Sequence, residues 1–548
     1  MRRDGNRLPA GAPLLKVENL VITGRQGDVD KEIVSNATFR LAAGEVLGLI
    51  GESGAGKSTL GLASAGYTKN GCRIASGTVH YRDRALDMLP ARQLQALYGD
   101  RISYVAQSAQ ASFNPAHRLL EQVIEPALAH GVCRRAEAIT RAGQLFRDLG
   151  LPDIGLLGRR YPHEVSGGQL QRVMIAMALI CDPDIVIFDE PTTALDMTTQ
   201  IDVIAAIRQV IRGSGMAALY ISHDLALVTQ LADRVLVMRN GRIVEEGAVA
   251  DVILAPTHAY TRMLVAARVH KKIRSDATGT VETGLAVRNV AVSYGNHRVV
   301  EDVSFNLPKG RTMAIIGESG SGKSSLARAI AGIVAPAHGK IRFGATDLAP
   351  RFQRRTPEQL RSIQMIFQSP DVSLNPKHSV GDVIGRPLEF YKGQKGAERD
   401  GNVRRLLEMI ELDPSMIDRK VNDLSGGQKQ RVCIARALAA EPELIICDEI
   451  TSALDPLVAE GMIALLTDLQ KRLALSYLFI THDFSSVEGL ADEVIVMKGG
   501  TVVETGATED VFNSSRDPYT RTLLSAVPRM ELDWLDRVLK TRQLAQAG

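Results

Sequence analysis

Two glycine-rich segments carry residue types that bind the phosphates of a nucleotide. Glycines leave backbone N–H groups open to phosphate, and the helix that follows adds positive potential at its N-terminus. The lysine of each segment is expected to reach the β- and γ-phosphates, and the serine after it to bind Mg²⁺. The expected nucleotide-binding residues are Gly51, Glu52, Ser53, Gly54, Ala55, Gly56, Lys57, Ser58 and Thr59, and then Gly317, Glu318, Ser319, Gly320, Ser321, Gly322, Lys323, Ser324 and Ser325.

An acidic pair follows an apolar segment in each half of the chain. Asp189 and Glu190 follow IVIF, and Asp448 and Glu449 follow LIIC. The aspartates suit contact with Mg²⁺, and the glutamates are placed to polarise an attacking water. Solvated acids or helix caps would explain one such pair, but not the recurrence of the pair at matched spacing in both halves.

The motifs recur with a period of about 260 residues, which indicates two whole domains in tandem. Lys57 and Lys323 are 266 positions apart, and the SGGQ segments that begin at Ser166 and Ser425 are 259 apart. Each loop lies between a predicted strand and a predicted helix. The apolar segments that end in acids are typical of buried parallel strands, whose carboxyl ends place ligands. Residues 114–161 and 375–421 have helical patterning. The sequence therefore predicts an α/β fold with a helical subdomain in each half.

Composition fits a globular protein with several domains. The chain has 548 residues, of which 45% are hydrophobic, and its 65 basic and 62 acidic side chains give a net charge of +3. That balance argues against a surface that binds nucleic acid. No apolar stretch approaches the ~20 residues that span a bilayer, and no signal peptide is expected. We expect a first domain over 1–267, a linker over 268–283, a second domain over 284–525 and a C-terminal helical tail over 526–548. Leu532, Leu535, Val538 and Leu539 share one face of that tail.

The ordered motifs resemble the ATP-binding cassette (ABC) family, and the resemblance covers nearly the whole chain in two copies. VSGGQLQR at 165–172 and LSGGQKQR at 424–431 are similar to the family signature. The resemblance implies two tandem P-loop NTPase ABC domains, each with a RecA-like α/β core, an antiparallel β subdomain and a helical subdomain. It also implies that the signature covers the γ-phosphate of ATP held by the other domain. The signature residues are Ser166, Gly167, Gly168 and Gln169, and Ser425, Gly426, Gly427 and Gln428.

The resemblance assigns roles to three further pairs. Gln107 and Gln368 match the glutamine that senses Mg²⁺ and transmits this signal to a membrane partner. Both are therefore expected among the metal-binding and the nucleotide-binding residues. His223 and His482 match the histidine that contacts γ-phosphate, and Asp196 and Asp455 match the aspartate that links the two sites.

Family architecture implies that the two domains pair head to tail within the chain. Site one would join the loop at 51–59 with the signature at 425–428. Site two would join the loop at 317–325 with the signature at 166–169.

Smaller motifs resemble ATPases of the oligopeptide/dipeptide/nickel importer group. They are SFNP and SLNP after each glutamine, RYPHEVSGG before the first signature, and AYTRML and PYTRTLL at the end of each half. The resemblance implies an ATP-hydrolysing motor for peptides or related small solutes, peripheral at the cytoplasmic face of the inner membrane. Its partners would be two permease subunits and, through them, a solute-binding protein. The resemblance also implies ATP and Mg²⁺. Many single-cassette members of the group carry cysteines soon after the Tyr-Thr-Arg motif that resemble iron–sulfur ligands, and because neither segment here is followed by such cysteines, no iron–sulfur cluster is expected.

The two halves differ at two positions. Tyr294 matches the aromatic residue that stacks on adenine, and Gly24 occupies that place in the first half. Ile450 stands where the first half has Pro191.

Two other functions remain open from the sequence. Translation factors that act on the ribosome also fuse two cassettes, but they carry a long, charged, helical connector. Near-neutral charge also disfavours RNA binding. A fused sugar-importer ATPase usually has one cassette that departs from the consensus, whereas here both halves keep the glycine-rich loop, the signature, the glutamate and the histidine.

Overall fold

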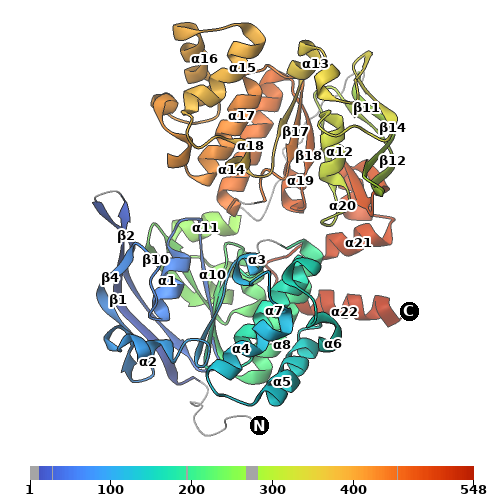
Figure 1. The fold of residues 1–548 in the computed structure, drawn as a ribbon. Coiled ribbons are helices and arrows are strands. Elements are labelled where there is room, and N and C mark those ends of the chain that lie inside the picture. Colours follow the sequence, from blue (N-terminus) through green and yellow to red (C-terminus); the bar gives the residue numbers. More distant parts are fainter. Residues whose placement is uncertain (1–10, 27–28, 193–194, 267–281, 453, 548) are drawn as a thin grey trace. The chain divides into compact units, whose positions relative to one another are not determined.

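The chain folds into two compact units (Figure 1). Residues 1–266 together with 528–548 form the first unit, and residues 267–527 form the second. The structure is a computed structural model, which describes the chain except for residues 1–10, 27–28, 193–194, 267–281, 453 and 548. The side chains of Gln26, Val29 and residues 543–547 are also outside the description. Most of the expected linker, 268–283, lies outside the described residues.

A six-stranded sheet forms the core of each unit. Every strand is parallel to its neighbours except the last one, β10 or β20, which pairs antiparallel at an edge. In the first unit the sheet order is β10-β9-β3-β8-β7-β6, and in the second it is β16-β17-β18-β13-β19-β20. The strands β3, β7, β8, β13, β17 and β18 are buried at every position, as expected for parallel strands covered on both faces. Their bounds are β3 Val46–Gly51, β6 Ile102–Val105, β7 Ile185–Asp189, β8 Ala217–Ile221, β9 Arg234–Arg239, β10 Arg242–Ala248, β13 Thr312–Ile316, β16 Ile363–Ile366, β17 Leu444–Asp448, β18 Ser476–Ile480, β19 Glu493–Lys498 and β20 Thr501–Ala507.

A smaller antiparallel sheet of four strands completes the β structure of each unit. Its order is β2-β1-β4-β5 in the first unit and β12-β11-β14-β15 in the second. Apolar residues of this sheet, such as Leu15 and Val17, share one buried cluster with Leu47 and Leu49 of β3. The sheet therefore packs against the strand that leads into the loop. The bounds are β1 Pro13–Gln26, β2 Val29–Ala42, β4 Cys72–Tyr81, β5 Arg84–Ala85, β11 Thr283–Tyr294, β12 His297–Pro308, β14 His338–Phe343 and β15 Thr346–Asp347.

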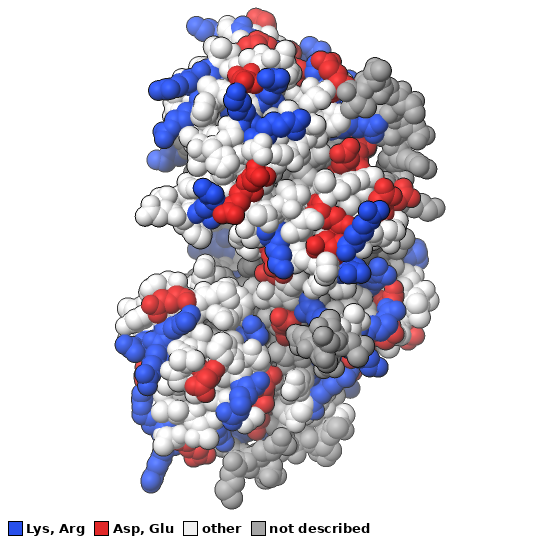
Figure 2. Space-filling model, turned by 90° about the vertical axis from the view of Figure 1, so that its right-hand side faces the viewer, with Lys and Arg blue, Asp and Glu red and all other residues white. Residues whose placement is uncertain are grey.

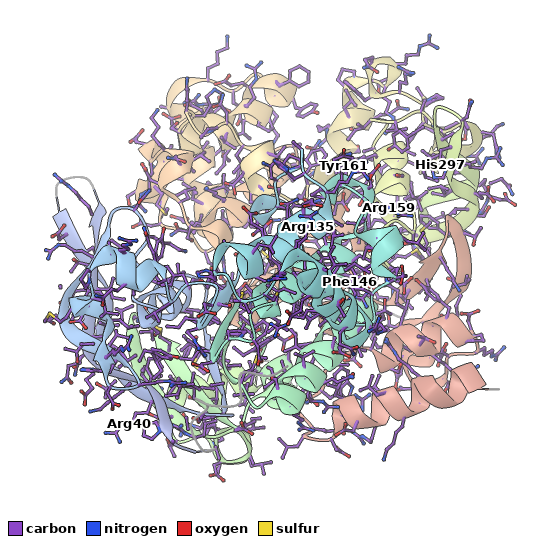
Figure 3. All side chains as sticks on the ribbon, turned by 60° about the horizontal axis from the view of Figure 1, so that its bottom comes forward. Arg40, Arg135, Phe146, Arg159, Tyr161 and His297 are labelled. Carbon is purple, nitrogen blue, oxygen red and sulfur yellow. The ribbon has the colours of Figure 1, made fainter. Side chains whose placement is uncertain are left out.

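Helices fill the segments for which the sequence predicts a helical subdomain. Figure 1 shows α4, α5 and α6 grouped away from the antiparallel sheet of the first unit, and α15 and α16 likewise in the second. Phe146, labelled in Figure 3, is 1% exposed, because the amphipathic α5 turns its apolar side inward. The helices here are α3 Ala109–Ser112, α4 Leu119–Ala129, α5 Arg135–Asp148, α6 Ile154–Leu157, α14 Pro370–Ser373, α15 Val380–Lys392 and α16 Gly396–Met409.

The remaining helices flank the core sheets and end each repeat. They are α1 Lys57–Ser64, α2 Ala91–Gln95, α7 Gly167–Leu179, α8 Met197–Ser214, α9 Leu225–Leu231, α10 Val249–Leu254 and α11 Ala259–Ala266 in the first repeat. Their counterparts are α12 Lys323–Ile330, α13 Pro357–Ser362, α17 Gly426–Leu438, α18 Pro456–Leu473, α19 Phe484–Leu490, α20 Thr508–Ser514 and α21 Pro518–Ser525.

The C-terminal helix α22, Trp534–Ala547, belongs to the first unit although it follows the second along the chain. It buries Trp534, Leu535 and Val538. The Gln230 side chain of α9 donates to the carbonyl oxygens of Arg529 and Glu531 and accepts from the Leu535 N–H. The prediction of a shared apolar face is wrong for Leu532, which is 52% exposed. The helix begins two residues later, so Trp534 is buried instead.

Charged side chains of both signs are interspersed on the face drawn in Figure 2. This mixture agrees with the small net charge of the chain.

Candidate active site

The two glycine-rich loops have nearly the same geometry. Each runs from the end of a buried strand, β3 or β13, into the N-terminus of a helix, α1 or α12. Gly56 and Gly322, at the N-caps of these helices, have φ of 95° and 98°. A Cβ at these positions would lie 2.8 Å from the Ile33 carbonyl oxygen and 2.5 Å from that of Val299. Glycine is therefore required at both positions on conformational and steric grounds.

The loop lysines are buried and turned back onto their own loops. The Lys57 Nζ donates to the carbonyl oxygens of Gly51 and Glu52, both at 2.9 Å. The Lys323 Nζ donates to those of Gly317 and Glu318, at 2.8 and 2.7 Å. Each ammonium group thus stands beside the loop in which phosphate is expected.

The serine and aspartate predicted to bind Mg²⁺ meet in both units. The Ser58 Oγ donates to Asp189 Oδ1 at 2.8 Å, and the Ser324 Oγ donates to Asp448 Oδ1 at the same distance. Both carboxylates are nearly buried, with 4% and 3% exposure. Hydroxyl and carboxylate oxygens are ligands that Mg²⁺ prefers, so the donor set fits this ion. Burial raises the pKa of Asp448 above its usual value, although the hydrogen bond from Ser324 acts against this.

The predicted glutamate, histidine and glutamine form a second cluster beside this pair. In the first unit Glu190 Oε2 lies 3.3 Å from His223 Nδ1 and accepts from Gln107 Nε2 at 3.1 Å. In the second, Glu449 Oε1 lies 3.5 Å from His482 Nδ1, and its Oε2 accepts from Gln368 Nε2 at 2.7 Å. Strands β6, β7 and β8 end together at one edge of the sheet, and β16, β17 and β18 do the same. These strand ends bring the three side chains together.

Both glutamates sit in an unfavourable backbone conformation. Glu190 and Glu449 have φ of 48° and 51°, which L-residues other than Asn and Asp rarely adopt. A backbone hydrogen bond from each N–H, to the Ile221 or Ile480 carbonyl oxygen, holds this conformation. Strained residues of this kind cluster at active sites. Burial alone would raise the pKa of Glu449, but the hydrogen bond from His482 and the charges of His482 and Lys323 outweigh it, so the pKa is lowered. The lowered pKa favours the ionised carboxylate, the form that a general base requires.

The signature segments cap helices in both units. Ser166 is the N-cap of α7, where its Oγ accepts from the Gln169 N–H and its own N–H donates to the Gln169 side chain. Ser425 and Gln428 make the same reciprocal pair at α17. The two glycines between them leave the first turn without bulky side chains, so its N–H groups can donate hydrogen bonds to an anion.

The linking aspartates are also helix caps. Asp196 caps α8 by accepting from the Thr199 N–H at 3.0 Å, and Asp455 caps α18 by accepting from the Val458 N–H at 3.1 Å. Gly168 lies against the first turn of α8, since an added Cβ would be 2.1 Å from Thr199 Cγ2. The signature and this aspartate therefore form one packed corner within the unit.

Strand register places Gly24 opposite Lys31 and Tyr294 opposite His297. Both lie at corresponding points of the β1–β2 and β11–β12 hairpins. Tyr294 is 45% exposed, as an aromatic ring that receives a base would be. Ile450 is 2% exposed within an apolar cluster, so its exchange with Pro191 is a change in packing.

Three tyrosines near the site were not predicted from the sequence. The Tyr104 hydroxyl donates to Asp189 Oδ2 at 2.5 Å. The hydroxyls of Tyr260 and Tyr519 accept from the N–H of Glu52 and of Glu318. Tyr260 and Tyr519 stand in the Tyr-Thr-Arg motifs, whose recurrence at the end of both halves was the available signal.

Two known protein families match the sequence of this chain. A family described as "ABC transporter" matches residues 34–193 and 300–452. The chain belongs to the ABC transporter family. A second family, described as "Oligopeptide/dipeptide transporter, C-terminal region", matches residues 503–547. The predicted fold, two tandem ABC P-loop NTPase domains, and the predicted importer group are thereby confirmed.

Relatives of similar length share both units. The "Glutathione import ATP-binding protein GsiA" of Escherichia coli O157:H7 is 37% identical over 560 residues, covering 94% of this chain and 90% of the relative. The "Peptidoglycan transport ATP-binding protein YejF" of Agrobacterium fabrum is 38% identical over 538 residues, covering 95% and 97%. The chain is thus an ATP-hydrolysing ABC translocase subunit of the oligopeptide/dipeptide group.

A solved structure that spans both units has the same fold. It is described as a complex of the archaeal ribosomal stalk protein aP1 and the ribosome recycling factor aABCE1. It matches with a TM-score of 0.61 at 20% identity, covering 92% of this chain and 94% of that one. At this identity the likeness shows the fold alone. Within the described residues, no helix has the length and apolar character that a membrane span requires.

Proposed function

We propose that this chain is the motor of an importer for peptides or related small solutes, peripheral at the cytoplasmic face of the inner membrane. It would couple ATP binding and hydrolysis to two permease subunits, which receive solute from a binding protein. The observation that carries the proposal is that both units hold the full set of loop lysine, serine–aspartate pair and glutamate–histidine–glutamine cluster.

The relatives support the peptide class of solute. Their names state import of glutathione and transport of peptidoglycan, and the oligopeptide/dipeptide family matches the C-terminal region. Glutathione is itself a short peptide, and peptidoglycan contains peptide stems. We therefore propose a small peptide, or a peptide-containing fragment, as the solute.

The residues divide the chemistry between them. Lys57 and Lys323 would bind the β- and γ-phosphates, and the serine–aspartate pairs would hold Mg²⁺, which supplies charge neutralisation at the phosphates. Glu190 and Glu449 would orient and deprotonate the attacking water. His223 and His482 hold these glutamates and would contact the γ-phosphate. Gln107 and Gln368 would report the occupancy of the site to the permeases.

Each ATP site would combine the loop of one unit with the signature of the other. The full chain can test this pairing. Glu449→Gln leaves hydrolysis to the loop at 51–59, and a second substitution then removes one signature. Adding Ser425→Arg should abolish the remaining hydrolysis, whereas adding Ser166→Arg should leave most of it. The opposite pattern would show that each loop uses the signature of its own unit.

Transport is tested with two permease subunits and a binding protein of the oligopeptide/dipeptide group that co-purify with this chain. The complex, reconstituted in proteoliposomes with the binding protein, should take up a labelled dipeptide, tripeptide or glutathione only with ATP. The Glu190→Gln and Glu449→Gln double variant is the control and should take up none. A chain that fails to co-purify with the permeases and instead sediments with ribosomes would refute the proposal.

A further inference from the structure

Each unit anchors a tyrosine on the loop that is expected to bind phosphate. The Glu52 N–H donates to the Tyr260 hydroxyl at 2.9 Å, and the Glu318 N–H donates to the Tyr519 hydroxyl at 3.1 Å. The tyrosines lie about 200 positions from the loops, in α11 and α21. The same contact therefore occurs once in each unit.

A cation lies over the ring of each tyrosine. The Arg239 guanidinium carbon lies 4.8 Å from the centre of the Tyr260 ring, and the Lys498 Nζ lies 4.7 Å from that of Tyr519. Both distances are within the range of a cation–π contact. The use of Arg in one unit and Lys in the other shows that the geometry is kept although the residue differs.

The cation follows a residue that already touches the loop. A Cβ on Gly51 would lie 2.1 Å from the Met238 carbonyl oxygen, and one on Gly317 would lie 2.2 Å from that of Met497. The entry of each loop thus packs directly on the end of β9 or β19. The next residue, Arg239 or Lys498, supplies the cation. Strand end, loop entry and tyrosine form one contiguous contact.

The helix that carries the tyrosine is fixed at its start. Glu245 of β10 accepts from the Thr257 N–H at 2.7 Å and from the His258 N–H at 3.1 Å. Burial alone would raise the pKa of Glu245, but the hydroxyl of the neighbouring Thr261, together with the hydrogen bonds from Thr257 and His258, outweighs it and lowers the pKa to about 2. In the second unit Glu504 of β20 accepts from the Arg516 N–H and the Ser515 hydroxyl.

The hydrogen bonds of the loop entry show what the tyrosine adds. In the first unit Lys57 binds the carbonyl oxygens of Gly51 and Glu52, and Tyr260 binds the Glu52 N–H. The second unit repeats the arrangement with Lys323 and Tyr519. We expect the lysine to give up one or both of these carbonyl oxygens when it binds phosphate. The tyrosine then remains as a side-chain hold on the entry peptide.

We propose that Tyr260 and Tyr519 are positioning residues of the two nucleotide sites, which keep the loop in its phosphate-binding shape when the lysine leaves it. This inference rests on the nucleotide sites of the proposed function. It gives the Tyr-Thr-Arg motif a role within the unit, namely to tie the end of each repeat to its loop.

The test removes one hydroxyl at a time in the full chain. Tyr260→Phe and Tyr519→Phe keep the ring and its cation contact. The matched controls are Tyr98→Phe and Tyr477→Phe, because these two hydroxyls have no hydrogen-bond partner among the described residues. Hydrogen exchange of the loop peptides, measured without nucleotide, reports the contact directly. We expect faster exchange confined to about residues 49–60 in Tyr260→Phe and to about residues 315–326 in Tyr519→Phe, with none in the controls.

Nucleotide binding supplies the second readout. Loss of one net hydrogen bond should weaken ATP binding at the altered site about three- to tenfold. The KM for ATP should rise while kcat changes less than twofold, since the hydroxyl does not touch the reacting atoms. Unchanged loop exchange with unchanged ATP affinity would overturn the inference. Exchange that accelerates evenly over the whole unit, with a lower Tm, would also overturn it. If wild type itself bound no ATP, the proposed function would fail, while the exchange measurement would still judge the contact.

Discussion

Two hydroxyl groups donate to the aspartate proposed to bind Mg²⁺ in the first unit, whereas one does so in the second. Asp189 accepts from both Ser58 and Tyr104, and Asp448 accepts from Ser324. Met365 of β16 stands where β6 has Tyr104, and its thioether donates no hydrogen bond. At the position expected to contact adenine, the second unit has the additional group instead, since it has Tyr294 where the first unit has Gly24.

The comparison distinguishes the residues that both units share from those that differ between them. The lysine, the serine–aspartate pair and the glutamate–histidine–glutamine cluster are the same in both units, so both retain the groups for hydrolysis. The residues around the aspartate proposed to bind Mg²⁺ differ between the units, and so do those at the position expected to contact adenine. We therefore expect that both sites hydrolyse ATP but differ in affinity. The first unit should bind Mg²⁺ more tightly, and the second should bind the adenine of ATP more tightly.

Removal of the two glutamates should have the largest effect. Glu190→Gln and Glu449→Gln together should lower ATP hydrolysis by about 10²- to 10⁴-fold, the usual contribution of a general base, while ATP stays bound. Because both clusters are intact, each single variant should lose activity to a similar degree. Steady-state hydrolysis and retained radiolabelled ATP measure the two properties.

The control for this prediction shares the unusual backbone of the two glutamates. Glu441 has φ of 50° but lies on the surface, paired with Lys392. Glu441→Gln should hydrolyse ATP normally. A double variant at Glu190 and Glu449 with the wild-type rate would show that these glutamates are not the base.

The tail should stabilise one unit and not the other. Leu535 is fully buried in the first unit, so Leu535→Ala should lower the free energy of unfolding of that unit by about 2–5 kcal/mol. Calorimetry should show one transition shifted to lower temperature and the other unchanged. Leu532→Ala is the matched control, since that side chain is exposed. Equal shifts of both transitions would break the assignment of the tail to the first unit.

The sequence predicts local features well and distant contacts poorly. The loops, the acid-terminated strands and the signature helices each depend on neighbouring residues, so their patterns are complete in short segments. The Tyr104–Asp189 and Gln230–Leu535 contacts join residues 85 and 305 positions apart. No periodicity records such pairings. The match of Gly24 with Tyr294 lies between these cases, because it rests on the alignment of two short segments, NLVITG and NVAVSY.

Tyr104 should raise the Mg²⁺ affinity of site one. Tyr104→Phe removes one of two donors that orient Asp189, and loss of such a partner typically costs about 10- to 100-fold in metal affinity. The Mg²⁺ concentration for half-maximal ATP binding at that site should rise accordingly. The reciprocal variant, Met365→Tyr, places a phenol beside Asp448 and should tighten Mg²⁺ binding at site two. If both variants match wild type, the extra hydroxyl does not distinguish the sites.

The smallest expected effect concerns the contact with the adenine base of ATP. Tyr294 can stack on adenine, and a stacked aromatic ring is worth roughly 1–3 kcal/mol by alanine substitution in nucleic-acid complexes. At ~1.4 kcal/mol per decade, Tyr294→Ala should weaken one of two ATP-binding events about tenfold. The other event should change little, because Gly24 offers no ring and phosphate contacts ignore the base. Site one should for the same reason discriminate poorly between ATP and GTP.

The gain-of-function variant sharpens this last test. A Cβ on Gly24 would lie 2.5 Å from Ile33 Cδ1, the far end of a flexible side chain, so a tyrosine needs room there. Gly24→Tyr combined with Ile33→Ala should therefore strengthen the weaker event, and Ile33→Ala alone is its control. Nucleotide titration by calorimetry resolves the two events with ATP and with GTP. Two equal events in wild type that neither Tyr294→Ala nor the double variant alters would show that stacking does not set affinity. The asymmetry of the two units would then lie at the metal ligand alone.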